Sequence, residues 1–355
     1  MALSFSISSP VGAWCDLLPA SLASLRAQNA PMSVALLDAS GDARVAALAD
    51  RYADFLSYRR SGPDAGQSDA ILEGWANAPG DILGWLNADD ILMPGALEMA
   101  LARFKADPQL DVVYGHSVII DGSGAMTGYH FAVDPRIERL AEAGIISQPS
   151  CFFRREAYAR AGGLDRSLHY VMDWELWIRM MKAGARFGFI DAPLSMVLWG
   201  EETKTASFNK RRREEIRSVL ARHAPDGKQS GVFRAFAIHT LTEKLRPAGL
   251  RKAVLRRLRR AGPVIYGVGA DGRLHDGAKL FLAHFSDAPK SRLSLEVEGD
   301  ARAIEPAVAG GALVARMQDR LEVAFAAPVE AGRTLVVDIA VAKSARVYLK
   351  RCVLI

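Results

Sequence analysis

The stretch FLSYRRSGPDAGQSDAILEGWANAPGDILGWLNADD, residues 55–90, contains a strand, a helix and a second strand in close succession. Residues 55–59 are strand-like, residues 67–78 have apolar side chains at helical spacing, and residues 82–87 are strand-like again. Gly and Pro separate the three segments, as tight turns require. A helix between two consecutive strands predicts an α/β sheet whose strands run parallel.

The same alternation extends toward the N-terminus. It predicts strands at residues 3–9 and 32–38 and helices at residues 15–28 and 43–52. The fold class is therefore α/β, with a mostly parallel sheet flanked by helices. Ligands of such sheets bind at the carboxyl ends of the strands, so the residues that follow each strand are the first candidates for a site.

A different pattern follows residue 111, with short strand signals and two helices expected at residues 173–183 and 206–223. After residue 263 several short alternating runs, such as 293–298, predict a small all-β domain of the sandwich type. Three parts are therefore expected, namely an α/β domain, a basic helical linker and a β-sandwich-like accessory domain, at residues 1–225, 226–262 and 263–355.

Composition excludes several classes of protein. The 355 residues are 50% hydrophobic and 24% charged, which is typical of a folded chain of about two domains. The net charge of +5 is too small for a dedicated nucleic-acid binder. No apolar run is long enough for a membrane helix and no signal peptide is evident. Three widely spaced cysteines predict neither disulfides nor a zinc site, which favours the cytoplasm.

Acidic residues follow the predicted strands. Asp38 ends the second strand, Asp64 follows the third, and Asn87-Ala88-Asp89-Asp90 ends the fourth. Adjacent carboxylates such as Asp89 and Asp90 can hold a hard divalent cation, Mn²⁺ or Mg²⁺, that also binds substrate phosphates. The alternative is that one of the two acids only caps the following helix.

Two further segments suit a binding site. The loop of residues 61–70 contains glycines and leads into a helix, which allows a ligand to approach closely, although Ser68 or Asp69 could simply cap that helix. Asp173 opens a helix with two tryptophans, Trp174 and Trp177, where an ionised carboxylate could accept a proton from a sugar hydroxyl. The alternative is an N-cap on an amphipathic helix, and for Trp177 a core position is favoured.

Three motifs resemble glycosyltransferase family 2, which has the GT-A fold. They are GPDAGQSDAI (62–71), GDILGWLNADDILMPGAL (80–97), and QPSCFFRREAYARAGGLD (148–165) followed by DWELWIR (173–179). The resemblance covers roughly residues 3–225 and implies an inverting, metal-dependent transferase of hexosyl type. It further implies a nucleoside-diphosphate sugar donor, UDP-type by expectation. The implied acceptor is a glycan or a lipid-linked molecule in cell-surface or extracellular polysaccharide synthesis.

The resemblance also assigns roles to individual residues. It implies that Asp173 is the catalytic base and that Asp89, with Asp90, holds the cation. The remaining candidates line the nucleotide-sugar pocket (Asp38, Asp64, Gly66, Gln67, Asp69, Asn87, Asp89) or the acceptor side (Gln148, Asp165, Trp174). Three places depart from the family pattern. Asn87 replaces the first metal-binding acid, and Met172 replaces the acid before the base. The first strand ends in Ser8-Ser9-Pro10-Val11, where the family typically has an Asn or Thr.

Two other functions stay open. A non-catalytic protein that binds a nucleotide sugar or glycan through a GT-A fold is supported only by Asn87. A sugar-nucleotide nucleotidyltransferase would need a Gly-rich phosphate loop near the N-terminus, which residues 8–12 do not supply.

Basic residues form a further group of candidates. Residues 244–260 contain eight Lys or Arg and no acid, which predicts either a helix at an anionic membrane surface, with the enzyme peripheral at the inner face, or a plain linker helix. Lys204, Arg211 and Arg212 could reach a diphosphate, although a solvated helix face is favoured for any one of them.

Several features are not expected to carry chemistry. The GxGxxG match at residues 267–272 precedes no helix, so no dinucleotide site is expected there. His116 and His130 lack ligand spacing. The accessory domain could bind a glycan or a partner, or only pack on the catalytic domain.

Overall fold

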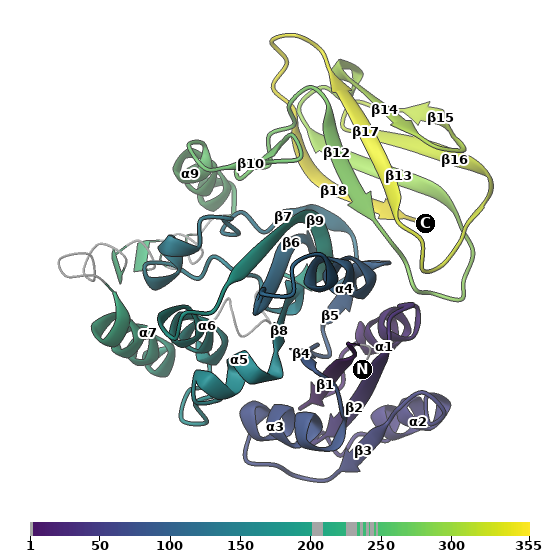
Figure 1. The fold of residues 1–355 in the computed structure, drawn as a ribbon. Coiled ribbons are helices and arrows are strands. Elements are labelled where there is room, and N and C mark those ends of the chain that lie inside the picture. The colour runs from purple at the N-terminus through teal and green to yellow at the C-terminus, as the bar shows by residue number, and fades with distance from the viewer. Residues whose placement is uncertain are drawn as a thin grey trace. The chain divides into compact units, whose positions relative to one another are not determined.

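The computed structural model describes residues 3–200, 209–224, 233–234, 237–238, 241, 245 and 248–355 (Figure 1). The chain divides into two compact units. The N-terminal unit joins Met1–Ser117, Ala132–Val197 and Ser207–Phe233, and the C-terminal unit joins Val118–Phe131, Leu198–Ala206 and Arg234–Ile355. This division differs from the three consecutive parts expected from the sequence, because residues of the segment 118–131 pair with a C-terminal strand.

The N-terminal unit contains the predicted parallel sheet. Its parallel strands lie in the order β3 (Tyr58–Ser61), β2 (Met32–Asp38), β1 (Phe5–Val11) and β4 (Ile82–Trp85). All seven residues of β1 are buried, as expected of a strand covered on both faces. The α/β fold class is therefore confirmed.

Antiparallel strands extend this sheet beyond β4. β8 (Cys151–Arg154) pairs with β4 and with the start of β6 (Val112–Ile120). The short strand signals expected after residue 111 include one continuous strand of nine residues, β6. A short strand β5 (Asp90–Leu92), not expected from the sequence, pairs with β9 (Phe187–Leu198).

Helices cover both faces of the parallel strands. α1 (Leu18–Arg26), α2 (Ala43–Arg51) and α4 (Ala96–Ala106) contribute to the main apolar core on one face. α3 (Gln67–Asn77) packs on the other face, and a Cβ added at Gly74 would lie 2.2 Å from the Ser8 hydroxyl oxygen. Only glycine allows this close approach, which lets α3 pack directly against β1.

Three further helices in the N-terminal unit are described from end to end. They are α5 (Arg155–Arg160), α6 (Met172–Lys182) and α7 (Lys210–His223), with 3₁₀ turns at Ile137–Ala141 and Gln148–Ser150. Glu215 of α7 accepts hydrogen bonds from the backbone N–H groups of His169 (3.0 Å) and Tyr170 (2.7 Å). α7 thereby holds the loop that leads into α6.

A buried ion cluster joins α6 to α7. Glu175 is only 1% exposed, and its carboxylate lies 2.8 Å from Arg179, 3.6 Å from Arg222 and 3.4 Å from His223. Burial lowers the pKa of His223, and the positive charge of Lys182 acts in the same direction. The charge of Glu175 is therefore balanced mainly by the two arginines.

Between residues 248 and 355 the C-terminal unit consists of β-strands and their connections, apart from helix α9 (Ala248–Arg259) and a 3₁₀ turn at Ala301–Ala303. Its strands alternate between buried and exposed residues, so each sheet has one apolar face. One antiparallel sheet has the order β15 (Gly311–Arg316), β16 (Arg320–Val329), β13 (Lys290–Glu298), β18 (Tyr348–Leu354), β7 (Met126–Tyr129). The other has the order β12 (Ala278–Leu282), β17 (Leu335–Val341), β14 (Ile304–Val308). The predicted small β domain is confirmed.

The GxGxxG segment forms a tight hairpin. β10 (Val264–Ile265) pairs with β11 (Val268–Gly269), and Tyr266 and Gly267 between them have positive φ angles of 47° and 74°. Strand β12 and not a helix follows, so the arrangement of a dinucleotide-binding loop is absent from this described segment.

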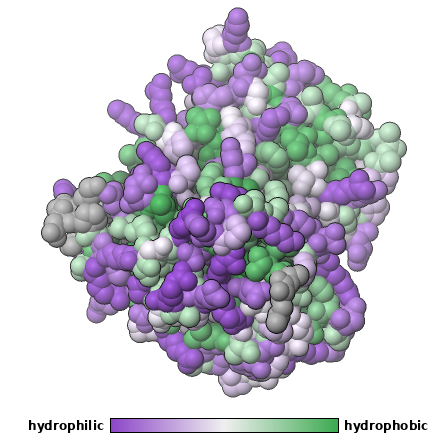
Figure 2. All heavy atoms as spheres, viewed as in Figure 1, coloured by the Kyte–Doolittle hydropathy of each residue, from purple (hydrophilic) through white to green (hydrophobic). Residues whose placement is uncertain are grey.

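Hydrophilic side chains cover much of the face in Figure 2, with hydrophobic ones scattered among them. The most exposed large apolar residues of the C-terminal unit include Leu250, Leu258, Val264, Val314 and Met317. Within the described residues, no helix combines the length and the apolar character needed to span a bilayer.

Candidate functional site

Asp38 lies at the carboxyl end of β2 and is 4% exposed. One of its carboxylate oxygens accepts hydrogen bonds from the Ser40 N–H (2.8 Å) and the Ser40 hydroxyl (2.6 Å). The other oxygen has a longer contact, 3.5 Å, with the Ser61 hydroxyl. The second oxygen is therefore the better placed of the two to accept a bond from a ligand.

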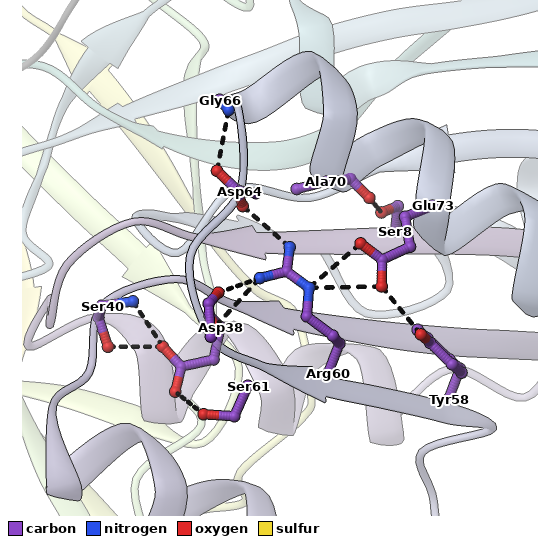
Figure 3. A network of polar contacts seen from close by, with 11 residues as sticks. Ser8, Asp38, Ser40, Tyr58, Arg60, Ser61, Asp64, Gly66, Ala70 and Glu73 are labelled. Atoms are coloured by element: carbon purple, nitrogen blue, oxygen red, sulfur yellow. Dashed lines mark hydrogen bonds and ion pairs between the residues drawn. The ribbon is translucent and has the colours of Figure 1, made fainter.

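Asp64 shapes the loop between β3 and α3 (Figure 3). One carboxylate oxygen accepts the Gly66 N–H at 2.9 Å, and the other accepts Arg60 at 3.0 Å. Gly66 has a φ of +127°, which an L side chain rarely adopts, and α3 begins at the next residue, Gln67. Sequence reasoning selected Asp64 and Gly66 but missed Arg60.

Asn87 is the centre of a polar network. Its side-chain NH₂ donates to Asp90 (2.9 Å) and to the Gln148 side-chain oxygen (3.0 Å), and its oxygen accepts from Gln67 (2.7 Å). Gln148 in turn donates to the backbone oxygen of Trp85 at 2.8 Å. The Asn87 amide therefore links its own segment to the start of α3 and to the turn at Gln148.

The two acids after Asn87 have different surroundings. Asp90 is 4% exposed at the start of β5, and burial, reinforced by the charge of Asp89, raises its pKa well above the usual range. Asp89 is partly exposed. No cluster of three His, Cys, Asp or Glu side chains that could hold a metal occurs among the described residues. Asp89 fits the kind of site in which one carboxylate and substrate phosphates share the cation.

Asp173 lies in the first turn of α6 and is partly buried. The Ser68 hydroxyl of α3 donates to the sulfur of Met172 at 2.9 Å, which brings the starts of α3 and α6 together. Because the neighbouring Gln67 bonds to Asn87, two side-chain contacts connect the segment of Asp89 with that of Asp173.

Arg212 of α7 is electrostatically coupled to the candidate base. Burial lowers the pKa of Arg212, and the negative charge of Asp173 opposes that shift. Arg211 is instead occupied by Glu215 at 3.0 Å. Lys204 lies outside the described residues.

The candidates for the acceptor side are not equally accessible. Trp174 is 4% exposed and its indole N–H donates to the Leu140 oxygen at 2.7 Å, so its ring has little surface to offer a sugar. Trp177 is 1% exposed, which confirms the core position. Asp165 accepts from the Ser167 N–H and hydroxyl at 2.9 and 2.6 Å. Gln148 stands within the Asn87 network.

Asp69, in the first turn of α3, forms an ion pair with Arg166 at 2.9 Å. This ion pair connects α3 to the loop before α6. The Asp69 carboxylate is therefore already paired with an arginine.

Comparison with known proteins identifies the N-terminal unit. Residues 15–162 match the family model described as Glycosyl transferase family 2. Residues 15–162 are therefore a glycosyltransferase family 2 region. The structure of S. aureus TarS 1–349 in complex with UDP-GlcNAc aligns with a TM-score of 0.52 at 14% identity, covering 74% of this chain and 82% of that one. At this identity the likeness concerns the fold, and the GT-A expectation is confirmed.

Curated relatives of this glycosyltransferase are much longer than the region they share with it. The O-antigen biosynthesis protein RfbC of Myxococcus xanthus is 33% identical over 125 residues, 35% of this chain and 10% of that protein. The chondroitin synthase of Escherichia coli is 25% identical over 189 residues, 51% of this chain and 27% of the synthase. The chain thus aligns with about a quarter or less of these two relatives.

Proposed function

We propose that this glycosyltransferase moves a hexosyl group from a nucleoside-diphosphate sugar, UDP-type, to a hydroxyl of a glycan or lipid-linked acceptor. We place the reaction in cell-surface or extracellular polysaccharide synthesis and on the cytoplasmic side of the membrane. The carrying observation is the pair of contacts Gln67–Asn87 and Ser68–Met172, which bring the segments of Asp89 and Asp173 to one edge of the sheet. The names of the relatives, an O-antigen biosynthesis protein and a chondroitin synthase, support this choice.

The proposed reaction inverts the anomeric centre. The acceptor oxygen forms a bond to the anomeric carbon while the bond from that carbon to the diphosphate oxygen breaks on the opposite face. Asp173 accepts the proton of the acceptor hydroxyl. A divalent cation held through Asp89 would offset the negative charge that the leaving diphosphate gains. Arg212, which is electrostatically coupled to Asp173, would assist the base.

The roles of the two adjacent acids can be separated by substitution. In a thermal-shift screen of nucleotides and nucleotide sugars with Mn²⁺ or Mg²⁺, the wild type should be stabilised only when cation and nucleotide are both present. Asp89→Asn should lose most of this shift. Asp90→Asn should keep it, and should not lower Tm at pH 7, because a neutral side chain then replaces a buried acid of raised pKa. If only Asp90→Asn loses the thermal shift, Asp90 and not Asp89 holds the cation.

A non-catalytic, binding-only protein is the second candidate. Its support was the missing acid at Asn87, but the amide there has a structural role of its own in joining Gln67, Gln148 and Asp90. Slow cation-dependent release of free nucleoside diphosphate from a nucleotide-sugar panel would favour the enzyme, and binding without any release would favour the alternative.

We also propose that α9 contacts anionic lipid. Part of its charge is used within the C-terminal unit, since Arg256 donates to Glu298 at 2.7 Å and Arg259 lies 4.8 Å from the Phe131 ring. Arg257, Leu258 and Arg260 are exposed and form the surface that would meet the lipid.

Reversing two charges tests the membrane proposal. The double change Arg257→Glu and Arg260→Glu should weaken co-sedimentation with vesicles that contain phosphatidylserine, since each basic residue contributes about 1 kcal/mol near such a surface. Arg333→Glu, at an exposed position in the same unit, is the control. If all variants co-sediment equally, or if the wild type co-sediments equally with neutral and anionic vesicles, α9 is only a linker helix.

A further inference from the structure

Arg60 connects the strand ends and the loop of the nucleotide site (Figure 3). Its side chain is 17% exposed and comes from β3. The guanidinium donates to Asp64 at 3.0 Å and to Glu73 at 3.1 Å. It also donates to the backbone oxygens of Gly62 and, at 3.5 Å, Asp38. One side chain thus contacts the ends of β2 and β3, the following loop and α3.

The loop between β3 and α3 has no regular structure to hold it. Gly62 and Gly66 have φ angles of +133° and +127°, and space around both is open on the side where a Cβ would lie. What fixes the loop is Asp64, with one oxygen on Gly66 and the other on Arg60. If Arg60 were removed, Asp64 would keep only its local bond.

Glu73 anchors Arg60 from the opposite side. Its carboxylate accepts from the Arg60 side chain and, at 2.8 Å, from the Tyr58 hydroxyl. Arg60 is therefore held between two carboxylates, one on a helix packed tightly on β1 and one in the loop. Because the planar guanidinium binds both carboxylates in a fixed geometry, it holds the loop against the edge of the sheet.

We infer that Arg60 is a positioning residue of the nucleotide site, which holds the loop of residues 62–66 and the end of β2 in the conformation that binds the nucleoside. This inference rests on the proposed function. It concerns a residue that acts through Asp64 and Asp38 and need not touch the nucleotide itself.

The neighbouring Arg59 provides a matched control. Successive residues of a strand point to opposite faces, and Arg59 forms an ion pair with Asp50 on the other side of β3. Arg59→Gln removes the same charge from the same strand without affecting the loop. Arg60→Lys keeps the positive charge but lacks the planar guanidinium that donates to both carboxylates. It should therefore restore only part of the UDP affinity that Arg60→Gln loses.

The 355-residue protein is titrated with UDP and Mn²⁺ in a calorimeter, and amide exchange of residues 61–67 is followed by mass spectrometry. Arg60→Gln should raise the Kd for UDP by about tenfold, the loss expected for about 1.4 kcal/mol, and should speed exchange in the loop. Arg59→Gln should stay within about twofold of the wild type on both measures.

The outcomes separate this inference from the proposed function. A wild type that binds no nucleotide contradicts the proposed function, while the exchange data still decide whether Arg60 orders the loop. Wild-type affinity and loop exchange in Arg60→Gln overturn the inference. If that variant does not fold, Glu73→Gln, which removes the anchor and keeps the arginine, should raise Kd and exchange in the same direction, and unchanged values there overturn it equally.

Discussion

Asp173→Asn is expected to lower kcat for glycosyl transfer by about 10²–10⁴-fold, the usual contribution of a general base. The amide cannot accept the proton of the acceptor hydroxyl, but it has nearly the shape of the carboxylate and keeps the first turn of α6 intact. Asp173 lies on a different segment from Asp38 and Asp64, which we propose for the nucleotide pocket. The affinity for UDP should therefore stay within about twofold of the wild type, as for a change remote from the pocket.

The measurement is transfer and UDP affinity on the same preparations, with a nucleotide sugar that the wild type accepts. Asp191→Asn, which removes an exposed acid of the N-terminal unit, serves as the control and should leave both quantities unchanged. Loss of UDP binding in Asp173→Asn would place this acid in the donor pocket. Glycosyl transfer at the wild-type rate in Asp173→Asn would show that Asp173 is not the catalytic base.

Sequence patterns predicted most elements of the N-terminal unit because its strands and helices alternate with clear turns. The strand at residues 32–38 and the start of the helix at Gln67 agree with the structure residue for residue. α4 was not expected, since its N-cap, Gly95, has a left-handed backbone and no capping side chain to signal a helix start. β5 was missed because its partner β9 lies about a hundred residues away.

Acids at strand ends were predictable, whereas the groups that hold them were not. Parallel strands bring their carboxyl ends to one edge, so Asp38, Asp64 and Asp89 could be placed without coordinates. Arg60 and Glu73 are 13 positions apart, and nothing local indicates that they pair. For Trp174 a signal existed, since it lies three positions before the core residue Trp177 and hence on the same helix face.

Asn87→Asp, which restores the acid of the family pattern, is expected to destabilise the enzyme. The Asn87 NH₂ lies 2.9 Å from the buried carboxylate of Asp90 and 3.0 Å from the Gln148 oxygen. A carboxylate in its place removes both donors and adds a like charge beside Asp90. A buried charged group left without a partner costs about 1–3 kcal/mol or more, so Tm should fall by several degrees.

The loss of folding stability in Asn87→Asp should increase with pH. Burial already raises the pKa of Asp90, and a second carboxylate beside it would raise the pair further in the folded state than in the unfolded one. A carboxyl group with a raised pKa in the folded state stabilises the fold when it is protonated. The loss of folding stability therefore grows as the pH rises above about 4, where carboxyl groups ionise in the unfolded chain. Melting curves should therefore show a larger difference from the wild type at pH 8 than at pH 5.

The family pattern alone predicts the opposite result, namely a tighter cation site with no loss of stability. Melting curves and Mn²⁺ titrations in the absence of nucleotide separate the two, with Asn77→Asp as a control at an exposed asparagine of α3. A variant at position 87 that is as stable as the wild type and binds Mn²⁺ more tightly would show that the amide is not needed to hold Gln67, Gln148 and Asp90 together. A destabilised variant that binds Mn²⁺ no more tightly than the wild type would show that this chain uses Asn87 to assemble the site and not to hold the cation.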